Sequence, residues 1–134
     1  MLSTEQLAHA ASLLEGRFRL SALWLFGSEA TGQTRPDSDV DLAALFSRPV
    51  DPEQLFTARL DLETLLGRSV DLVDLRKASA ILGRQAVQGG RLLLDRDPVD
   101  RHVFSMLLPS RYVDLKISRR EAEHALIEAV HDRR

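Results

Sequence analysis

Two aspartates, Asp39 and Asp41, stand two residues apart at the start of an apolar run that continues to Phe46. Successive side chains of a strand alternate between its faces, so a strand here points both carboxylates the same way, with Cα atoms about 6.6 Å apart. Two like charges on one strand face repel each other unless a cation lies between them. Carboxylate oxygens are the preferred ligands of hard divalent ions. The spacing therefore predicts a divalent-cation site.

Gly27 and Ser28 directly follow another apolar run, Leu23 to Phe26, and can supply the other half of such a site. A glycine lets the backbone approach a ligand closely, and the N–H groups that open a helical turn can hold phosphate oxygens. An anion-binding turn beside a cation-binding pair of acids suits a metal-bound nucleoside triphosphate. We therefore expect this stretch to bind a nucleotide.

A second pair of acids, Asp71 and Asp74, lies in the strand expected over residues 69–75. Because these two stand three residues apart, they face opposite sides of the strand, and at most one can join Asp39 and Asp41. Asp71 is flanked by apolar residues, whereas Asp74 lies near the strand end, where it can be solvated or cap the next helix. The residues alone leave both alternatives open.

The stretch from Gly27 to Leu42 carries a compound pattern: Gly-Ser, three residues, Gly, five residues, then Ser-Asp-Val-Asp-Leu. Because this pattern lies between two strand-like runs, the chain resembles the polymerase-beta-like nucleotidyltransferases, and most closely the minimal nucleotidyltransferases. Members of that group often serve as antitoxins to HEPN-domain toxins (the MntA-type antitoxins of type VII toxin–antitoxin systems). Glu29 departs from the family pattern. It puts an acid next to the expected phosphates, which bears on how tightly a nucleotide binds.

The resemblance implies that the chain is an antitoxin enzyme, a Mg²⁺-dependent nucleotidyltransferase. It would transfer AMP from ATP to a tyrosine of a partner HEPN toxin, neutralise the toxin and form a hetero-oligomer with it. Two Mg²⁺ ions are expected, about 3.5–4 Å apart. Asp71 is favoured over Asp74 because the family's third acid has a sequence context like that of Asp71. The resemblance thus implies nucleotide binding by Gly27 and Ser28, and catalysis and metal binding by Asp39, Asp41 and Asp71.

Two other functions remain open from the sequence. The acceptor could be a small hydroxylated molecule, such as an aminoglycoside-like antibiotic. Alternatively, the chain could be a non-catalytic module that neutralises a toxin by contact alone. The intact pattern of acids argues against the second alternative, and the few residues after the expected core leave no room for a separate acceptor domain.

The elements that must position these residues indicate an α+β fold. We expect helices over 3–16, 51–67, 78–88 and about 97–132, and strands over 18–26, 39–46, 69–75 and 91–94, the last of them buried. A capping box at Ser3, and Asp51 followed by a proline, mark two helix starts. We expect a small mixed sheet with helices mainly on one face and the carboxylates on the other. A single domain, 1–134, would have its core over about 1–95 and then a long C-terminal helical region.

Composition limits the remaining classes of protein. The chain has 134 residues, of which 44% are hydrophobic and 28% charged, as in an ordinary globular domain. It contains no cysteine, no run long enough to span a membrane and no sign of a signal peptide, so we expect a cytoplasmic protein without a membrane partner. The net charge of −2 argues against direct nucleic-acid binding, which needs a basic surface.

Overall fold

The computed structural model of the chain describes residues 1–32 and 38–108. Its helices and strands alternate, and a further helical stretch covers residues 98–108. In chain order, the elements are α1 (Thr4–Arg17), β1 (Leu20–Phe26), α2 (Ser28–Thr31), β2 (Val40–Phe46), α3 (Pro52–Leu66), β3 (Val70–Asp74), α4 (Ala80–Gly89) and β4 (Arg91–Asp95).

Within the described residues, the strands form one four-stranded sheet in the order β3-β2-β1-β4. β1 runs antiparallel to both of its neighbours, whereas β2 and β3 are parallel. Parallel neighbours need a crossover connection, and α3 supplies it. The predicted α+β fold with a small mixed sheet is therefore confirmed.

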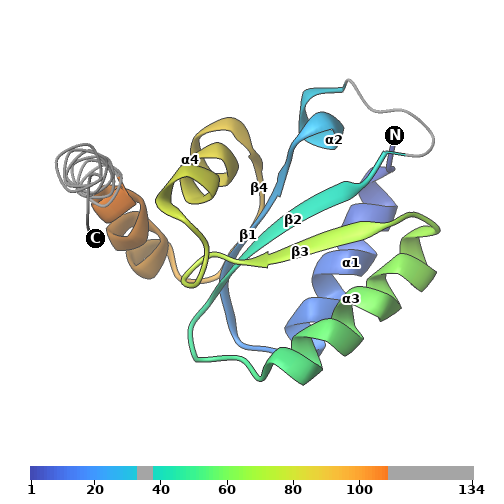
Figure 1. Cartoon of the computed structure of the whole chain (residues 1–134), viewed down its shortest axis with the longest axis horizontal. Helices are drawn as coiled ribbons and strands as arrows, with labels where there is room; N and C mark the ends of the chain where they lie inside the picture. Colours follow the sequence, from blue (N-terminus) through green and yellow to red (C-terminus); the bar gives the residue numbers. More distant parts are fainter. Residues whose placement is uncertain (33–37, 109–134) are drawn as a thin grey trace, which may run out of the picture.

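Helices flank both faces of this sheet (Figure 1). On one face, α1 and α3 pack against Leu23, Leu42 and alternate neighbours along the strands. On the other face, Trp24, Phe26 and Leu45 pack with α4 and residues 98–108. Asp41 lies between Val40 and Leu42 in β2 and so points to this second face. The acids are thus opposite α1 and α3, as predicted, on a face that α4 also covers in part.

Local signals in the sequence account for the helix ends. Ser3 accepts from the backbone N–H of Gln6 at 3.1 Å, and the Gln6 side chain accepts from the Ser3 N–H at 2.9 Å, so the predicted capping box is confirmed. Asp51 caps α3 ahead of a proline, and Gly67 ends that helix with a φ of 68°. Arg68 follows Gly67 on the way to β3, and its side chain donates to the carbonyl oxygen of Ser38, just ahead of β2.

The prediction that the strand over 91–94 is buried was wrong. β4 is an edge strand that pairs only with β1, and Leu92 remains 39% exposed. Its run of leucines suggested an interior strand, but an edge position exposes part of the strand to water. The helical stretch that follows is nevertheless fixed to the sheet, because the Ser21 hydroxyl donates to Asp100 at 2.6 Å.

Only the first part of the predicted C-terminal helical region falls on described residues. Residues 98–108 are helical, and Asp97 caps them by accepting from the Asp100 N–H at 3.1 Å. The rest of the predicted region, to about 132, lies outside the described residues. No helix in the described ranges is long and apolar enough to cross a membrane.

Candidate functional site

Adjacent strands bring three predicted acids to one end of the sheet. Asp41 of β2 and Asp71 of β3 are direct partners in the parallel pairing. Partner residues on neighbouring strands point to the same face about 4.8 Å apart, so these two carboxylates are neighbours. Asp39, two residues before Asp41, lies just ahead of β2 and shares that face.

Asp74 is not part of this group. It pairs with Ala44, further along β2, and lies on the other face from Asp71. Its carboxylate accepts from the backbone N–H of Arg76 at 3.2 Å and so caps the turn after β3. The structure therefore brings Asp71, and not Asp74, to the pair of acids. That Asp71 binds a metal stays a prediction.

The electrostatics of the group favour a bound cation. The pKa of the Asp41 carboxyl is raised above its ordinary value, first by burial and then by the like charges of Asp71 and Asp39. Among the described residues, no three His, Cys, Asp or Glu side chains are placed to hold an ion by themselves. Mg²⁺ fits such a site, because it is usually held by one or two carboxylates together with substrate phosphates and water.

Gly27 brings the backbone into contact with these acids. Its φ of 72° is in the region that only glycine adopts without strain, and a Cβ added there would lie 2.2 Å from the Asp41 Oδ2. The close approach therefore requires a glycine. Ser28 follows as the first residue of the short helix α2 and is half-buried. Gly27, Ser28 and Asp41 line the same pocket.

Glu29 points away from the side of the Gly-Ser turn where phosphates are expected, which corrects the expectation from the sequence. It is only 2% exposed, and its carboxylate accepts from Arg68 at 2.7 Å and from the Leu2 N–H at 2.6 Å. The sequence could not indicate this orientation, because Arg68 lies 39 residues away. Glu29 is paired inside the protein and therefore adds no unpaired charge where phosphates are expected, at the Gly-Ser turn.

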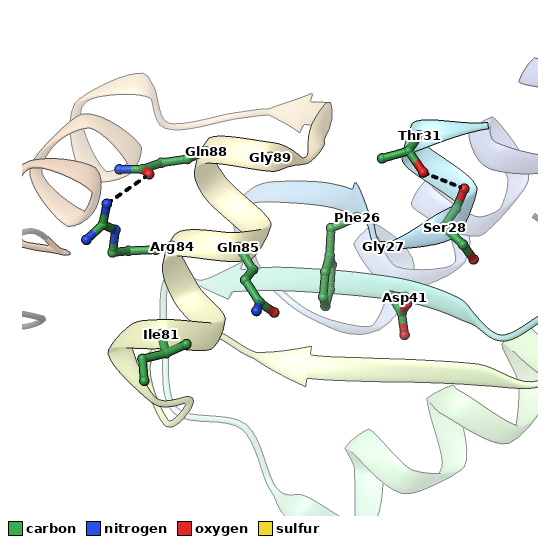
Figure 2. A pocket seen from close by; sticks show the side chains of 10 residues that line it. All are labelled: Phe26, Gly27, Ser28, Thr31, Asp41, Ile81, Arg84, Gln85, Gln88 and Gly89. Atoms are coloured by element: carbon green, nitrogen blue, oxygen red, sulfur yellow. Dashed lines mark hydrogen bonds between the residues drawn. The ribbon is translucent and has the colours of Figure 1, made fainter. Parts of the chain in front are cut away.

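α4 forms the opposite wall of the pocket, which has a volume of about 890 Å³. Ile81, Arg84, Gln85 and Gln88 line it from α4. Figure 2 shows Gln85 pointing toward Phe26, whereas Arg84 and Gln88 lie together on the side of α4 away from Asp41. The sequence analysis missed these residues. Their helical spacing marks one face of α4, but nothing in the sequence shows that this face meets the acids.

Known proteins share this architecture. Residues 9–99 match the family described as polymerase beta, nucleotidyltransferase. The curated protein adenylyltransferase MntA of Shewanella oneidensis is 34% identical over 101 residues, which cover 75% of this chain and 72% of that protein. The expected resemblance to MntA-type proteins is thus confirmed.

Solved structures agree with the sequence match. A toxin–antitoxin crystal structure with AMP-PNP contains a chain that is 30% identical, with a TM-score of 0.79, over 98% of this chain and 100% of that one. A structure of a tri-AMPylated Shewanella oneidensis HEPN toxin in complex with its MNT antitoxin matches at 28% identity and a TM-score of 0.74, over 97% of this chain and 100% of that one. Together with the paired acids and the Gly-Ser turn, these matches show that the chain belongs to the polymerase beta-type nucleotidyltransferase family.

Proposed function

We propose that this chain is a Mg²⁺-dependent adenylyltransferase that neutralises a HEPN toxin by transferring AMP from ATP to one of its tyrosines. The observation that carries the proposal is the register of β2 and β3, which sets Asp71 beside Asp41. Asp41 of this group lines the same pocket as Gly27 and Ser28. The similarity to MntA, an adenylyltransferase by name, supports this reaction over other transfers of a nucleotide.

Asp39, Asp41 and Asp71 are the residues that would hold Mg²⁺. Bound Mg²⁺ would neutralise the charge of the triphosphate and polarise its oxygens. The pKa of Asp41, which is raised first by burial and then by the like charges of Asp71 and Asp39, supports this assignment, because a cation would offset the repulsion. The close contact between Gly27 and Asp41 would place phosphate oxygens against the backbone and the carboxylate together.

The chain's own residues would orient the two reactants. Gly27 and Ser28 would hold the β- and γ-phosphates, so that the α-phosphorus faces the acceptor. The tyrosine oxygen forms a new bond to that phosphorus, while the bond from the α-phosphorus to the bridging oxygen breaks and pyrophosphate leaves. We assign the phenolic proton to Asp71, which is exposed to solvent and lies in register with Asp41. Positioning of this kind supplies much of the rate enhancement in phosphoryl and nucleotidyl transfer.

α4 would hold the nucleoside part of ATP. Gln85 points from α4 toward Phe26, across the pocket from Gly27 (Figure 2). An amide side chain carries both a donor and an acceptor, as does the edge of an adenine base. Ile81 lies one helical turn away on the same wall and offers an apolar surface that is 43% exposed.

The toxin would dock on the region from Asp97 onward, which is not needed for the acids. In the described part of that region, residues 98–108, several large apolar side chains are exposed: Val99 (74%), Val103 (49%), Met106 (64%) and Leu107 (54%). Large exposed apolar patches mark interaction sites. Two solved structures that match over nearly the whole chain are described as a toxin–antitoxin and as a HEPN toxin in complex with an MNT antitoxin, which supports a toxin as the partner.

The deciding experiment is incubation of the purified protein with its HEPN toxin, ATP and Mg²⁺, followed by mass spectrometry of the toxin. We expect the toxin to gain one or more AMP units on tyrosine and to lose its toxicity. The Asp39→Asn, Asp41→Asn double variant should bind the toxin but leave its mass unchanged. Equal neutralisation by this variant would show that contact is the mechanism. Transfer of AMP only to a small hydroxylated molecule would support the aminoglycoside-like alternative.

A further inference from the structure

Arg68, between α3 and β3, bonds to two segments of the candidate site at once. Its Nε and Nη2 donate to the carbonyl oxygen of Ser38 at 3.1 and 2.8 Å, and its Nη1 donates to Glu29 Oε1 at 2.7 Å. The side chains of Arg68 and Glu29 are only 12% and 1% exposed. We refer to Arg68, Glu29 and the Ser38 carbonyl as the Arg68 brace.

One end of the brace lies against the first metal-binding acid. Ser38 directly precedes Asp39 in the chain. On the other side of Asp39, the N–H of Val40 donates to the carbonyl oxygen of Ser69 at 2.8 Å. Arg68 and Ser69 therefore hold the backbone on both sides of Asp39, and the position of this acid depends on the start of β3.

The other end of the brace lies in α2, because Glu29 directly follows Ser28. The guanidinium thus links the phosphate-binding turn to the strand of acids through side-chain bonds. A planar guanidinium with a rigid set of donors can hold a carbonyl and a carboxylate in fixed directions at once. A lysine ammonium is a point charge on a flexible stem and cannot reproduce that geometry.

We propose that Arg68 and Glu29 are positioning residues of the transferase, which set the distance between the carboxylate group and the Gly-Ser turn. The inference rests on the function proposed above. A purely stabilising role accounts for the buried Arg68–Glu29 pair less well than a positioning role does. The cost of desolvating a buried ion pair largely offsets the attraction between its charges. Arg68 also donates twice to the backbone beside Asp39, in addition to its bond with Glu29.

Two variants separate positioning from stability. Arg68→Lys keeps the charge next to Glu29 and loses the paired bonds to Ser38. The Glu29→Met, Arg68→Met double variant removes the ion pair but fills its volume, a replacement that often leaves stability unchanged. The matched control is Arg96→Lys. Arg96 makes a bidentate contact with Glu15, at 2.7 and 3.1 Å, but on the exposed surface.

The test measures the affinity for Mn²⁺ with AMP-PNP by titration calorimetry, the kcat of AMP transfer to the toxin, and the melting temperature in EDTA. Loss of groups that orient metal ligands commonly lowers metal affinity or activity by about 10- to 100-fold. We expect losses of that size in both brace variants, with melting temperatures close to that of the wild type, and no loss in Arg96→Lys.

Wild-type affinity and kcat in both brace variants would overturn the positioning role. So would an affinity loss that merely follows the fraction of unfolded protein in the melts. The proposed function can fail separately. If the wild type binds Mn²⁺ with AMP-PNP but transfers nothing to the toxin, the transferase proposal is wrong, while the affinities of the variants still decide the role of Arg68 and Glu29.

Discussion

The Asp41 carboxylate is half-buried, and its closest charged neighbours in the sheet carry the same sign. Burial and the charges of Asp71 and Asp39 all raise its pKa, so the folded protein without metal holds its carboxylates under mutual repulsion. Groups arranged for ligand binding rather than for stability commonly show such perturbed pKa values. Two predictions at the scale of single residues follow from this repulsion.

Asp39→Asn and Asp41→Asn should each reduce AMP transfer to background, because an amide is a poor ligand for Mg²⁺. In EDTA, each variant should melt at the same temperature as the wild type or slightly above it, since the amide removes a like charge. Thermal melts followed by circular dichroism check the second expectation. A loss of several kcal/mol in either variant would mean that the acid is structural.

The raised pKa of Asp41 predicts how stability depends on pH. From the ordinary value of 3.8 up to the raised native value, the native state holds more protons on Asp41 than the unfolded state. The free energy of unfolding therefore falls as pH rises through this window and stays lower above it. Urea titrations in EDTA, for the wild type and Asp41→Asn, measure the effect as the difference between the two proteins. Glu15, whose pKa is lowered by Arg96, contributes in the opposite sense but equally to both proteins. A wild-type free energy of unfolding that rises with pH through this window, relative to that of Asp41→Asn, would contradict the prediction.

Gly27→Ala should abolish transfer, because the added Cβ would meet the Asp41 carboxylate at 2.2 Å. Its backbone, with φ 72° and ψ −153°, lies in a region essentially restricted to glycine and should cost a further ~1–3 kcal/mol of stability. Gly67→Ala is the control for a positive φ: at φ 68° and ψ 24° it lies in the left-handed region, which costs ~1–2 kcal/mol, and a Cβ there has nothing within 4 Å. We expect the control to lose stability and keep its activity, as measured by melts and by AMP incorporation. Equal activity losses in the two variants would indicate a backbone effect only.

At the scale of elements, the sequence predicted the features that depend on neighbouring residues better than those that depend on long-range contacts. The capping box at Ser3 and the Asp-Pro start of α3 act within a few residues, so the sequence alone indicates them. The orientation of Glu29 depends on Arg68, and the exposure of β4 depends on its place in the sheet order. Neither the orientation of Glu29 nor the exposure of β4 can be inferred from the residues next to it in the sequence. Strand alternation established only that Asp71 and Asp74 cannot both face Asp41, and the choice of Asp71 depended on the sequence context of the family's third acid.

The proposed role of α4 in holding the nucleoside makes a prediction at this scale. Gln85→Ala should raise the KM for ATP several-fold and narrow the preference for ATP over GTP, because one hydrogen bond contributes about 0.5–1.5 kcal/mol. Gln54→Ala is the control, since Gln54 lies on α3 and lines a different pocket. Steady-state kinetics with both nucleotides provide the measurement. An unchanged KM with an unchanged nucleotide preference would exclude Gln85 from the nucleoside site.

At the scale of the whole molecule, metal and nucleotide should stabilise the fold jointly. Each completes the other's site, so Mg²⁺ with ATP should raise the melting temperature more than the sum of the separate shifts. A ligand at 100 times its Kd stabilises by about 2.7 kcal/mol, which corresponds to several degrees for a domain of this size. Differential scanning fluorimetry with and without EDTA measures the shifts. A shift with ATP that EDTA leaves unchanged would argue against a metal–triphosphate site.

The parallel pairing of β2 with β3 also has a consequence for how the protein matures during synthesis. Gly27, Ser28, Asp39 and Asp41 leave the ribosome well before Arg68 and Asp71, which join them only after α3 has crossed over the sheet. Parallel pairings across a crossover are among the slower steps of folding. An antitoxin of the proposed kind is therefore inert while it is still a nascent chain. How long a newly made toxin stays active then depends on the order of translation as well as on affinity.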